Sequence, residues 1–381
     1  MVVSRTANGL RIGVIAPPWV PVPPVEYGGT ELVIDLLARG LVEAGNEVVL
    51  FTTGDSTCPV TRRWMHPHAL GTAAAPRGER EHVEAAYREL ADVDLIHDHT
   101  LAGPVRVGLH PTGTPVVTTA HGEFTPVMRR HFATAAARGV SVVAISHAQR
   151  STAPGIPVAA VIHHGIEPER FPAGRGDGRY ALFLGRMSPD KGAHRAIRIA
   201  RAAGRRIILA AKMQEPEERR YFTERVEPLL GDDAIFVGEV GGRRKVELIG
   251  GAEALVNPIR WPEPFGLVMI EALACGTPVL TFPEGAAPEI VEDGRTGWLC
   301  VDEDDMASKL AIVSQIDRAA CRASVRARFT AARMVREHLA LYRRLIAEQP
   351  VIELPAAAGG VTVDAPAGPS SASTCGPHLL R

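Results

Sequence analysis

Short apolar runs alternate with longer amphipathic stretches along most of the 381-residue chain. This alternation predicts a parallel sheet with helices on both faces. In the first half, strands are expected at 11–16, 47–52, 95–98, 115–119, 140–145 and 158–162, and helices at 30–44 and 82–90. The pattern then restarts, with strands at 180–184, 206–211, 234–237, 254–257 and 277–282, and helices at 190–203, 215–230, 243–250 and 266–274.

The restart falls in a polar, Gly/Pro-rich segment, 163–179, which we interpret as the domain boundary. The predicted fold class is α/β, with an N-terminal Rossmann-like domain at 1–165 and a second one at 166–325. Two doubly wound domains that face each other place the carboxyl ends of both sheets on one interdomain cleft. Ligands of such sheets bind at those ends.

The last helical region, about 317–347, is rich in arginine. One interpretation is a helix, 326–348, that packs its leucines back toward the N-terminal domain while the arginines face water. The alternative is a basic surface for peripheral contact with anionic lipid. The Ala/Gly/Ser/Pro-rich tail, 349–381, is predicted to be disordered. The arginines of this region are Arg318, Arg322, Arg326, Arg328, Arg333, Arg336, Arg343 and Arg344.

Composition narrows the class of protein. The hydrophobic fraction of 46%, the charged fraction of 22% and the net charge of -1 are those of a soluble globular protein, with no global signal for nucleic acid. The five cysteines have no paired spacing, which argues against a disulfide framework or zinc site and favours the cytoplasm. The apolar stretch at 10–18 is too short for a membrane span and lacks a signal-peptide layout.

The stretch P-E-P-F-G-L-V-M-I-E, 262–271, carries two glutamates eight residues apart. Pro264 and Gly266 predict that a helix begins near Gly266, so Glu263 lies before the helix and Glu271 inside it. Eight residues of helix span about 12 Å, well beyond the roughly 5–5.5 Å of a retaining glycosidase pair. The segment instead offers the amides of Phe265, Gly266, Leu267 and Val268 to an anion. A simple helix cap remains the alternative.

Three further groups follow predicted strands. Gly28, Gly29 and Thr30 join a strand to a helix, where the backbone can approach a phosphate, or they form a plain turn. Arg186 and Lys191 flank a short turn and are either phosphate-binding cations or solvated charges. His97 and His99 end a strand, but no further ligands accompany them, so we expect no metal site.

The combination of these motifs resembles family 4 glycosyltransferases, retaining enzymes of the GT-B fold. E-P-F-G-L-V-M-I-E-A-L-A-C-G-T-P-V is similar to the family's Glu-x7-Glu motif. Y-G-G-T-E at 27–31, H-D-H, T-A-H-G, A-I-S, L-G-R-M-S-P-D-K-G and E-D-G-R-T-G-W-L recur in family order. The resemblance covers about residues 10–347 and is closest to bacterial members with a P-P-x-x-Y-G-G loop.

The resemblance implies transfer of a hexose from a nucleotide diphosphate sugar to an acceptor hydroxyl with retention. It assigns His121, Arg186, Lys191 and Glu263 to catalysis. It assigns donor binding to the 28–30 loop, to the 265–268 amides and to Glu271, which binds the ribose. UDP-glucose is the favoured donor and GDP-mannose the next. Neither cofactor nor metal is expected. The acceptor, a saccharide, lipid-linked or natural-product hydroxyl, is assigned to His97, His99, Glu123 and Arg129.

Two segments depart from the family pattern. His163-His164-Gly165 stands where many members have Asn-Gly, and 285–289 differs where donor-sugar hydroxyls are usually bound. Two other functions stay open. A nucleotide-sugar epimerase of similar fold would convert a nucleotide sugar without an acceptor. A non-catalytic nucleotide-sugar-binding protein could dispense with Arg186 and Lys191, yet both are present. Peripheral attachment to the inner face of the membrane would accompany, not replace, transferase activity.

Overall fold

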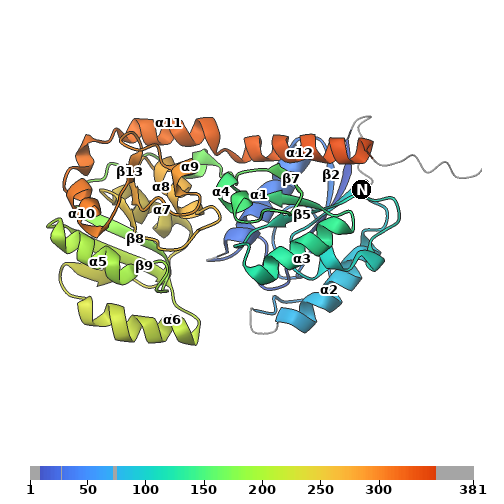
Figure 1. Ribbon diagram of the computed structural model, residues 1–381, viewed down its shortest axis with the longest axis horizontal. Helices are drawn as coiled ribbons and strands as arrows, with labels where there is room; N and C mark the ends of the chain where they lie inside the picture. Colours follow the sequence, from blue (N-terminus) through green and yellow to red (C-terminus); the bar gives the residue numbers. More distant parts are fainter. Residues whose placement is uncertain (1–8, 27, 72–74, 349–381) are drawn as a thin grey trace, which may run out of the picture. The chain divides into compact units, whose positions relative to one another are not determined.

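A computed structural model describes residues 9–26, 28–71 and 75–348 of the chain. Within these residues the polypeptide forms two parallel sheets, one after the other in the sequence (Figure 1). The predicted α/β class is confirmed. Tyr27 of the glycine loop and the predicted disordered tail, 349–381, lie outside the described residues.

The first sheet has seven parallel strands in the order β3-β2-β1-β4-β5-β6-β7. These strands are β1 (Arg11–Ile15), β2 (Glu47–Thr52), β3 (Thr61–Trp64), β4 (Leu95–Asp98), β5 (Val116–Ala120), β6 (Ser141–Ala144) and β7 (Val158–Val161). The helices of this half are α1 (Gly29–Glu43), α2 (Ala75–Glu89), α3 (Pro126–Ala137) and α4 (His147–Ser151).

The second sheet has six parallel strands in the order β10-β9-β8-β11-β12-β13. Its strands are β8 (Tyr180–Arg186), β9 (Arg206–Lys212), β10 (Ala234–Phe236), β11 (Leu255–Asn257), β12 (Val279–Thr281) and β13 (Gly297–Leu299). The helices that follow in sequence are α5 (Ala193–Ala202), α6 (Pro216–Tyr221), α7 (Gly242–Gly251), α8 (Leu267–Ala274), α9 (Ala287–Ile290), α10 (Glu303–Ala311), α11 (Arg318–Arg328) and α12 (Ala331–Ala347).

Both sheets are doubly wound, and in each the order of the strands along the sheet reverses at one point. The order reverses between β1 and β4 in the first sheet and between β8 and β11 in the second. The connections on either side of such a point leave in opposite directions, so a crevice opens at the carboxyl ends of the two strands. The strands that bound these crevices carry the loops with most of the predicted site residues, and β5, next to β4, is followed by His121, Glu123 and Arg129.

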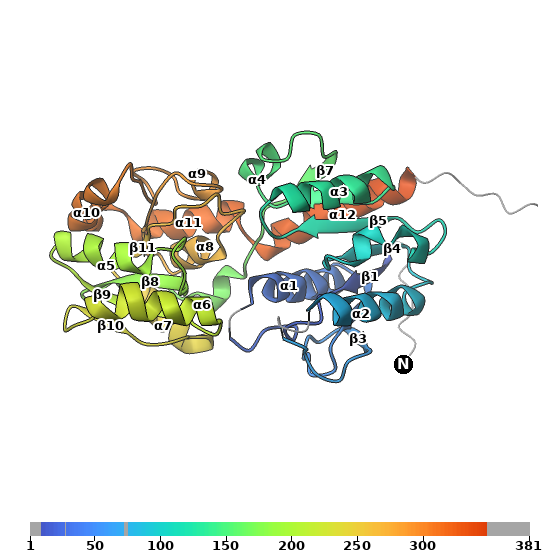
Figure 2. The same cartoon turned by 60° about the horizontal axis from the view of Figure 1, so that its bottom comes forward.

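The C-terminal helix α12 returns to the first sheet, as the sequence predicts (Figures 1 and 2). It packs on α1, and its Met334, Val335 and Tyr342 are buried in the same apolar cluster as Ile34 and Leu37. By contrast α11 packs on α8 in the second half. The core of the first sheet therefore contains residues from both ends of the described chain.

The predicted helical region at 317–347 consists of two helices, and the helix predicted at 326–348 begins only at Ala331, as α12. Phe329 and Thr330 separate α11 from α12, and the Thr330 hydroxyl accepts a hydrogen bond from the Arg333 amide as an N-cap. At this break the chain crosses from one half to the other beside the first crossing. The Ile166 amide donates to the Phe329 carbonyl at 2.9 Å, and the Ala331 amide donates to the Ile166 carbonyl at 2.7 Å.

Several short elements were not predicted. Strand β3 has the sequence T-R-R-W, and its two arginines hide the apolar alternation by which a strand is recognised. Strand β13 is only three residues long, too short for an alternation of apolar and polar residues to reveal it. The acidic run 302–305 begins helix α10, which Asp302 caps by accepting a hydrogen bond from the Asp305 amide at 2.8 Å.

Candidate active site

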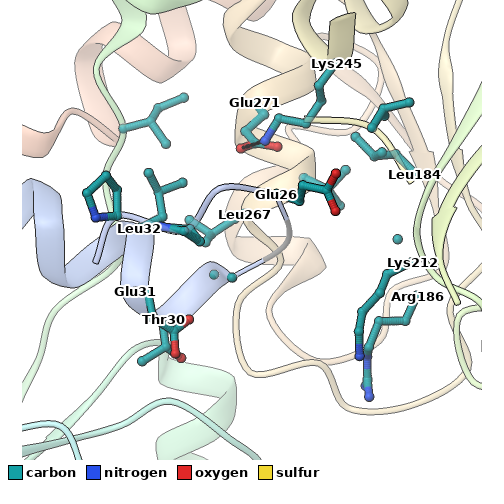
Figure 3. A pocket seen from close by; sticks show the side chains of 18 of the residues that line it. Glu26, Thr30, Glu31, Leu32, Leu184, Arg186, Lys212, Lys245, Leu267 and Glu271 are labelled. Atoms are coloured by element: carbon teal, nitrogen blue, oxygen red, sulfur yellow. Dashed lines mark hydrogen bonds and ion pairs between the residues drawn. The ribbon is translucent and has the colours of Figure 1, made fainter. Parts of the chain in front are cut away.

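A cleft with a volume of about 1260 Å³ lies at the carboxyl ends of the two sheets, and Figure 3 shows part of its lining. Its lining comes from the loop after β1, the residue after β5, the ends of β8 and β9, and the start of α8. All twelve residues that the sequence assigned to catalysis or donor binding line it: Gly28, Gly29, Thr30, His121, Arg186, Lys191, Glu263, Phe265, Gly266, Leu267, Val268 and Glu271.

The two glutamates of the 262–271 stretch each pair with a lysine of their own. Lys191 Nζ lies 2.5 Å from Glu263 Oε1 and 2.6 Å from Oε2, so it donates to both carboxylate oxygens. Lys245 Nζ donates to Glu271 Oε1 at 2.7 Å (Figure 3). Each carboxylate is thus neutralised separately, an arrangement suited to two binding groups.

Lys245 was not predicted as a site residue. It lies on α7, in the run R-R-K, and 26 residues separate it from Glu271. A cluster of cations on a helix next to a cleft was the only available signal, and such clusters are usually solvated faces. Only the packing of α7 beside α8 shows that this lysine reaches the cleft.

Two cations stand side by side at the ends of β8 and β9. Arg186 and Lys212 are direct neighbours in the parallel pairing of these strands, and their side chains run together in Figure 3. Their ion pairs are long: Arg186 Nη2 lies 3.9 Å from Asp190, and Lys212 Nζ lies 3.7 Å from Glu218. Lys212 was not predicted, because a lysine that ends a strand is usually only a surface charge.

The start of α8 depends on a glycine. Gly266 precedes the helix with φ 98°, in the left-handed region, and a Cβ there would lie 2.5 Å from Met269 Cε. Phe265 anchors the turn, since it is 2% exposed and its ring packs edge-on against the His164 ring at 5.2 Å. The positive end of the α8 dipole therefore faces the cleft from a fixed position.

The opposite wall is the glycine loop before α1. A Cβ on Gly28 would lie 2.6 Å from Pro24 Cβ, and a Cβ on Gly29 would lie 3.3 Å from Leu267 Cδ1 of α8. The loop is thus packed closely against α8 where the two halves meet. Glu31, which the sequence did not single out, lines the same wall, and burial raises the pKa of its carboxyl to about 7.

The half-buried His121 and the buried His99 and His164 form a group beside this wall. His121 Nε2 lies 2.8 Å from His99 Nδ1, and burial lowers the pKa of His121 to about 3. The imidazole of His164, from the segment between the sheets, stacks on His121 at 5.4 Å between ring centroids. Burial also holds the pKa values of His99 and His164 well below the usual histidine value. These rings are therefore neutral near pH 7.

Two glycosyltransferase families match the chain, one in each half. Glycosyltransferase Family 4 matches residues 27–170, and Glycosyl transferases group 1 matches residues 166–328. The chain thus matches glycosyltransferase families over both of its halves, as expected for the GT-B fold.

Solved structures agree with this assignment. AviGT4, a glycosyltransferase involved in avilamycin A biosynthesis, is 29% identical, with a TM-score of 0.69 over 89% of this chain and 98% of its own. HepE of Anabaena, solved with UDP and glucose, is 19% identical, with a TM-score of 0.70 over 88% of this chain and 100% of its own. The predicted GT-B fold is confirmed.

Curated relatives match the chain over part of their length. Glycogen synthase of Mycobacterium tuberculosis is 31% identical over 172 residues, which cover 43% of this chain and 41% of the synthase. D-inositol 3-phosphate glycosyltransferase of Streptomyces avermitilis is 32% identical over 201 residues, which cover 43% of this chain and 42% of the relative. The chain thus spans about two fifths of the length of each relative.

The four predicted acceptor residues do not line the cleft. His97 is wholly buried, and its ring nitrogens contact the Tyr342 hydroxyl at 2.6 Å and the Thr119 hydroxyl at 2.8 Å. The assignment of His97 to acceptor contact is therefore wrong for this conformation, because both ring nitrogens are already engaged inside the protein.

The other three acceptor assignments stay predictions. His99 is 5% exposed and contacts His121, which does line the cleft. Glu123 and Arg129 lie between β5 and the first turn of α3, and Arg129 Nε donates to the Phe124 carbonyl at 2.8 Å. Any contact between Arg129 and an acceptor is thus left to its terminal nitrogens.

Glu289 belongs to the 285–289 segment, in which the sequence departs from the family pattern. Its carboxylate accepts hydrogen bonds from the His147 amide at 3.0 Å and the Ala148 amide at 2.7 Å, and it contacts His163 Nε2 at 2.6 Å. Glu289 thus joins the second half of the chain to α4 of the first half. The binding of sugar hydroxyls by this segment remains a prediction.

The arginines of α11 and α12 divide into two groups. Arg318, Arg322, Arg328 and Arg333 donate to backbone carbonyls inside the protein. Arg326, Arg336, Arg343 and Arg344 are exposed, although Arg344 also donates to the Ala159 carbonyl at 3.0 Å. The prediction that the arginines face water is wrong for the first group. Peripheral membrane contact stays a prediction that rests on the second.

The cysteines, the possible metal ligands and the helix lengths also bear on the predictions from the sequence. Cys58, Cys275, Cys300 and Cys321 are buried free thiols. Among the described residues there is no group of three or more His, Cys, Asp or Glu side chains placed to hold a metal ion. No helix in the described ranges is long and apolar enough to cross a membrane.

Proposed function

We propose that this glycosyltransferase moves a hexose from a nucleotide diphosphate sugar to an acceptor hydroxyl, with retention at the anomeric carbon. The observation that carries the proposal is the convergence of Arg186, Lys212 and Lys191 with the N-terminus of α8 on one cleft. A diphosphate is the ligand whose charge such a group would neutralise. Glu271, held by Lys245 on one oxygen, keeps its other oxygen for a ribose hydroxyl.

The proposed reaction is a displacement on one face of the sugar. The acceptor oxygen bonds to the anomeric carbon, the bond from that carbon to the leaving phosphate oxygen breaks, and the acceptor proton passes to that oxygen. The protein positions both substrates and stabilises the charge on the leaving diphosphate. Glu263, which is held by Lys191, is proposed to accept hydrogen bonds from sugar hydroxyls. Neutral His121 is proposed to contact the sugar near the anomeric carbon.

Binding of a nucleotide should raise the thermal unfolding midpoint, because the ligand stabilises only the native state. We expect one of UDP, GDP, ADP and dTDP to give a selective shift, with UDP as the first to test. UDP-glucose and GDP-mannose follow. The shift should be lost in Glu271→Ala and kept in Glu247→Ala, a cleft glutamate that pairs only with the exposed Arg243. Absence of a shift with every nucleotide would refute the proposal.

The transferase should retain full activity in EDTA. In the proposed mechanism Arg186, Lys212 and the α8 dipole neutralise the diphosphate, the task that a divalent cation performs in metal-dependent transferases. The measurement is the transfer rate before and after dialysis against EDTA, then with added Mg²⁺ or Mn²⁺. A loss of activity that either ion restores would contradict the metal-independent mechanism.

A further inference from the structure

The ring of His121 is held in the cleft wall by groups on both sides. His99 follows β4 and His121 follows β5, which are neighbouring parallel strands, so the two side chains leave the sheet at the same edge. The His99 backbone is fixed in turn, because its amide donates to the Ile15 carbonyl at 2.9 Å. His164 packs on the other side of the His121 ring, at an interplanar angle of 22°.

The His99 ring packs on the His97 ring, which is itself held in place. The centroids of the two rings lie 3.9 Å apart. Tyr342, from α12, and Thr119, from β5, engage both nitrogens of His97. The position of His99 is thus determined by β4, β5 and the C-terminal helix together.

One nitrogen of each ring in the pair has no partner. His121 Nδ1 and His99 Nε2 are buried without a hydrogen bond to any of the described residues. His121 lines the cleft, and its Nε2 is already in contact with His99. Its Nδ1 is therefore the nitrogen that remains for a ligand hydroxyl.

We propose that His99 is a positioning residue, which orients His121 and sets the hydrogen-bonding role of His121 Nδ1 toward the sugar. The proposal rests on the proposed function. When His99 Nδ1 donates the proton of the shared bond, His121 carries its own proton on Nδ1 and donates to the ligand. When His121 Nε2 donates, Nδ1 is bare and accepts from a hydroxyl. Because both rings are neutral, one proton lies in the shared bond in either arrangement.

The test compares three variants. His99→Phe keeps an aromatic ring on His97 and removes the hydrogen bond. His99→Asn restores an amide that can donate or accept near the position of Nδ1. His82→Phe is the matched control, because His82 is equally buried in the first half, its Nε2 contacts the Ala16 carbonyl at 3.0 Å, and it does not line the cleft.

We expect His99→Phe to lower kcat about 10-fold, the loss of one oriented hydrogen bond, with the KM for the donor almost unchanged. His99→Asn should recover most of kcat. His82→Phe should lower the thermal midpoint as much as His99→Phe does without changing kcat. Wild-type kcat in His99→Phe, or equal losses in His99→Phe and His99→Asn, would overturn the proposal.

A second measurement separates this proposal from the proposed function. If the wild-type protein transfers sugar and His99→Phe transfers equally well, only the role of His99 fails. If no donor and acceptor react, the proposed function fails, and the pair is then tested by ¹⁵N NMR of the imidazoles. The His121 nitrogen shifts should change in His99→Phe, return toward wild type in His99→Asn and stay constant in His82→Phe. Unchanged shifts in His99→Phe would refute the positioning role.

Discussion

Replacement of Arg186 by alanine is expected to lower kcat by about 100- to 1000-fold, the usual loss when one preorganised group that stabilises transition-state charge is removed. The side chain lies at the end of β8 in the cleft, and its nearest ion pair is a loose one with Asp190 at 3.9 Å. Little internal structure depends on it, so the thermal midpoint should stay close to that of the wild type. The measurement is steady-state transfer with the donor identified by nucleotide binding.

Arg186 gives a cleaner test than Lys191. Loss of Lys191 would also release Glu263, whose carboxylate contacts that ammonium through both oxygens. Lys191→Ala is therefore expected to lower kcat and to alter donor binding together. Arg243→Ala is the matched control, because Arg243 lines the same cleft but is 92% exposed. Near-normal turnover in Arg186→Ala would exclude Arg186 from the reaction.

Replacement of Arg318 by methionine is expected to lower the free energy of unfolding by about 3 kcal/mol, because several buried acceptors lose their donor at once. The guanidinium donates to the carbonyls of Gly174, Gly250 and Ala252 at 3.1–3.2 Å and to the Thr277 hydroxyl at 2.9 Å. It therefore connects α11 to the segment before β8 and to the end of α7.

The control for Arg318 lies on the same helix. Arg326 is exposed, and Arg326→Met removes the same charge from α11. Urea denaturation should show a clearly lower midpoint for Arg318→Met. The midpoint of Arg326→Met should stay close to that of the wild type. Equal midpoints in the two variants would mean that the Arg318 hydrogen bonds are replaced by water at no cost.

Much of the fold could be predicted because apolar runs in parallel strands are nearly continuous. The end of β1 and the helix start near Gly266 both follow from local signals, a strand pattern and a helix-breaking glycine. The break between α11 and α12 could not be predicted, since Thr330 caps α12 only because the chain must cross to the other half there. Strand β3 was missed because only its backbone pairing with β2 defines it as a strand. Its sequence, T-R-R-W, has no apolar alternation from which that pairing could be predicted.

The candidate site was predictable where its residues follow motifs and unpredictable where tertiary packing selects them. Glu263 and Glu271 stand in a recognisable stretch, but their partners Lys191 and Lys245 lie 72 and 26 residues away. Lys212 enters the site only through its register with Arg186. His97 stands in a motif at a strand end, yet α12 covers it through Tyr342, a residue 245 positions later.

The return of α12 to the first sheet has a consequence for the order of events during synthesis. Buried residues of α12 complete a core whose other buried members come from the first half of the chain; they are Ala331, Met334, Val335, Leu339, Leu341 and Tyr342. A nascent chain that ends near residue 170 therefore lacks the helix that packs beside α1 in this core. The second half is continuous in sequence from β8 to α11 and can close its own core first. The first half is thus translated first but completes its core last. Its apolar surface stays exposed until α12 has been synthesised.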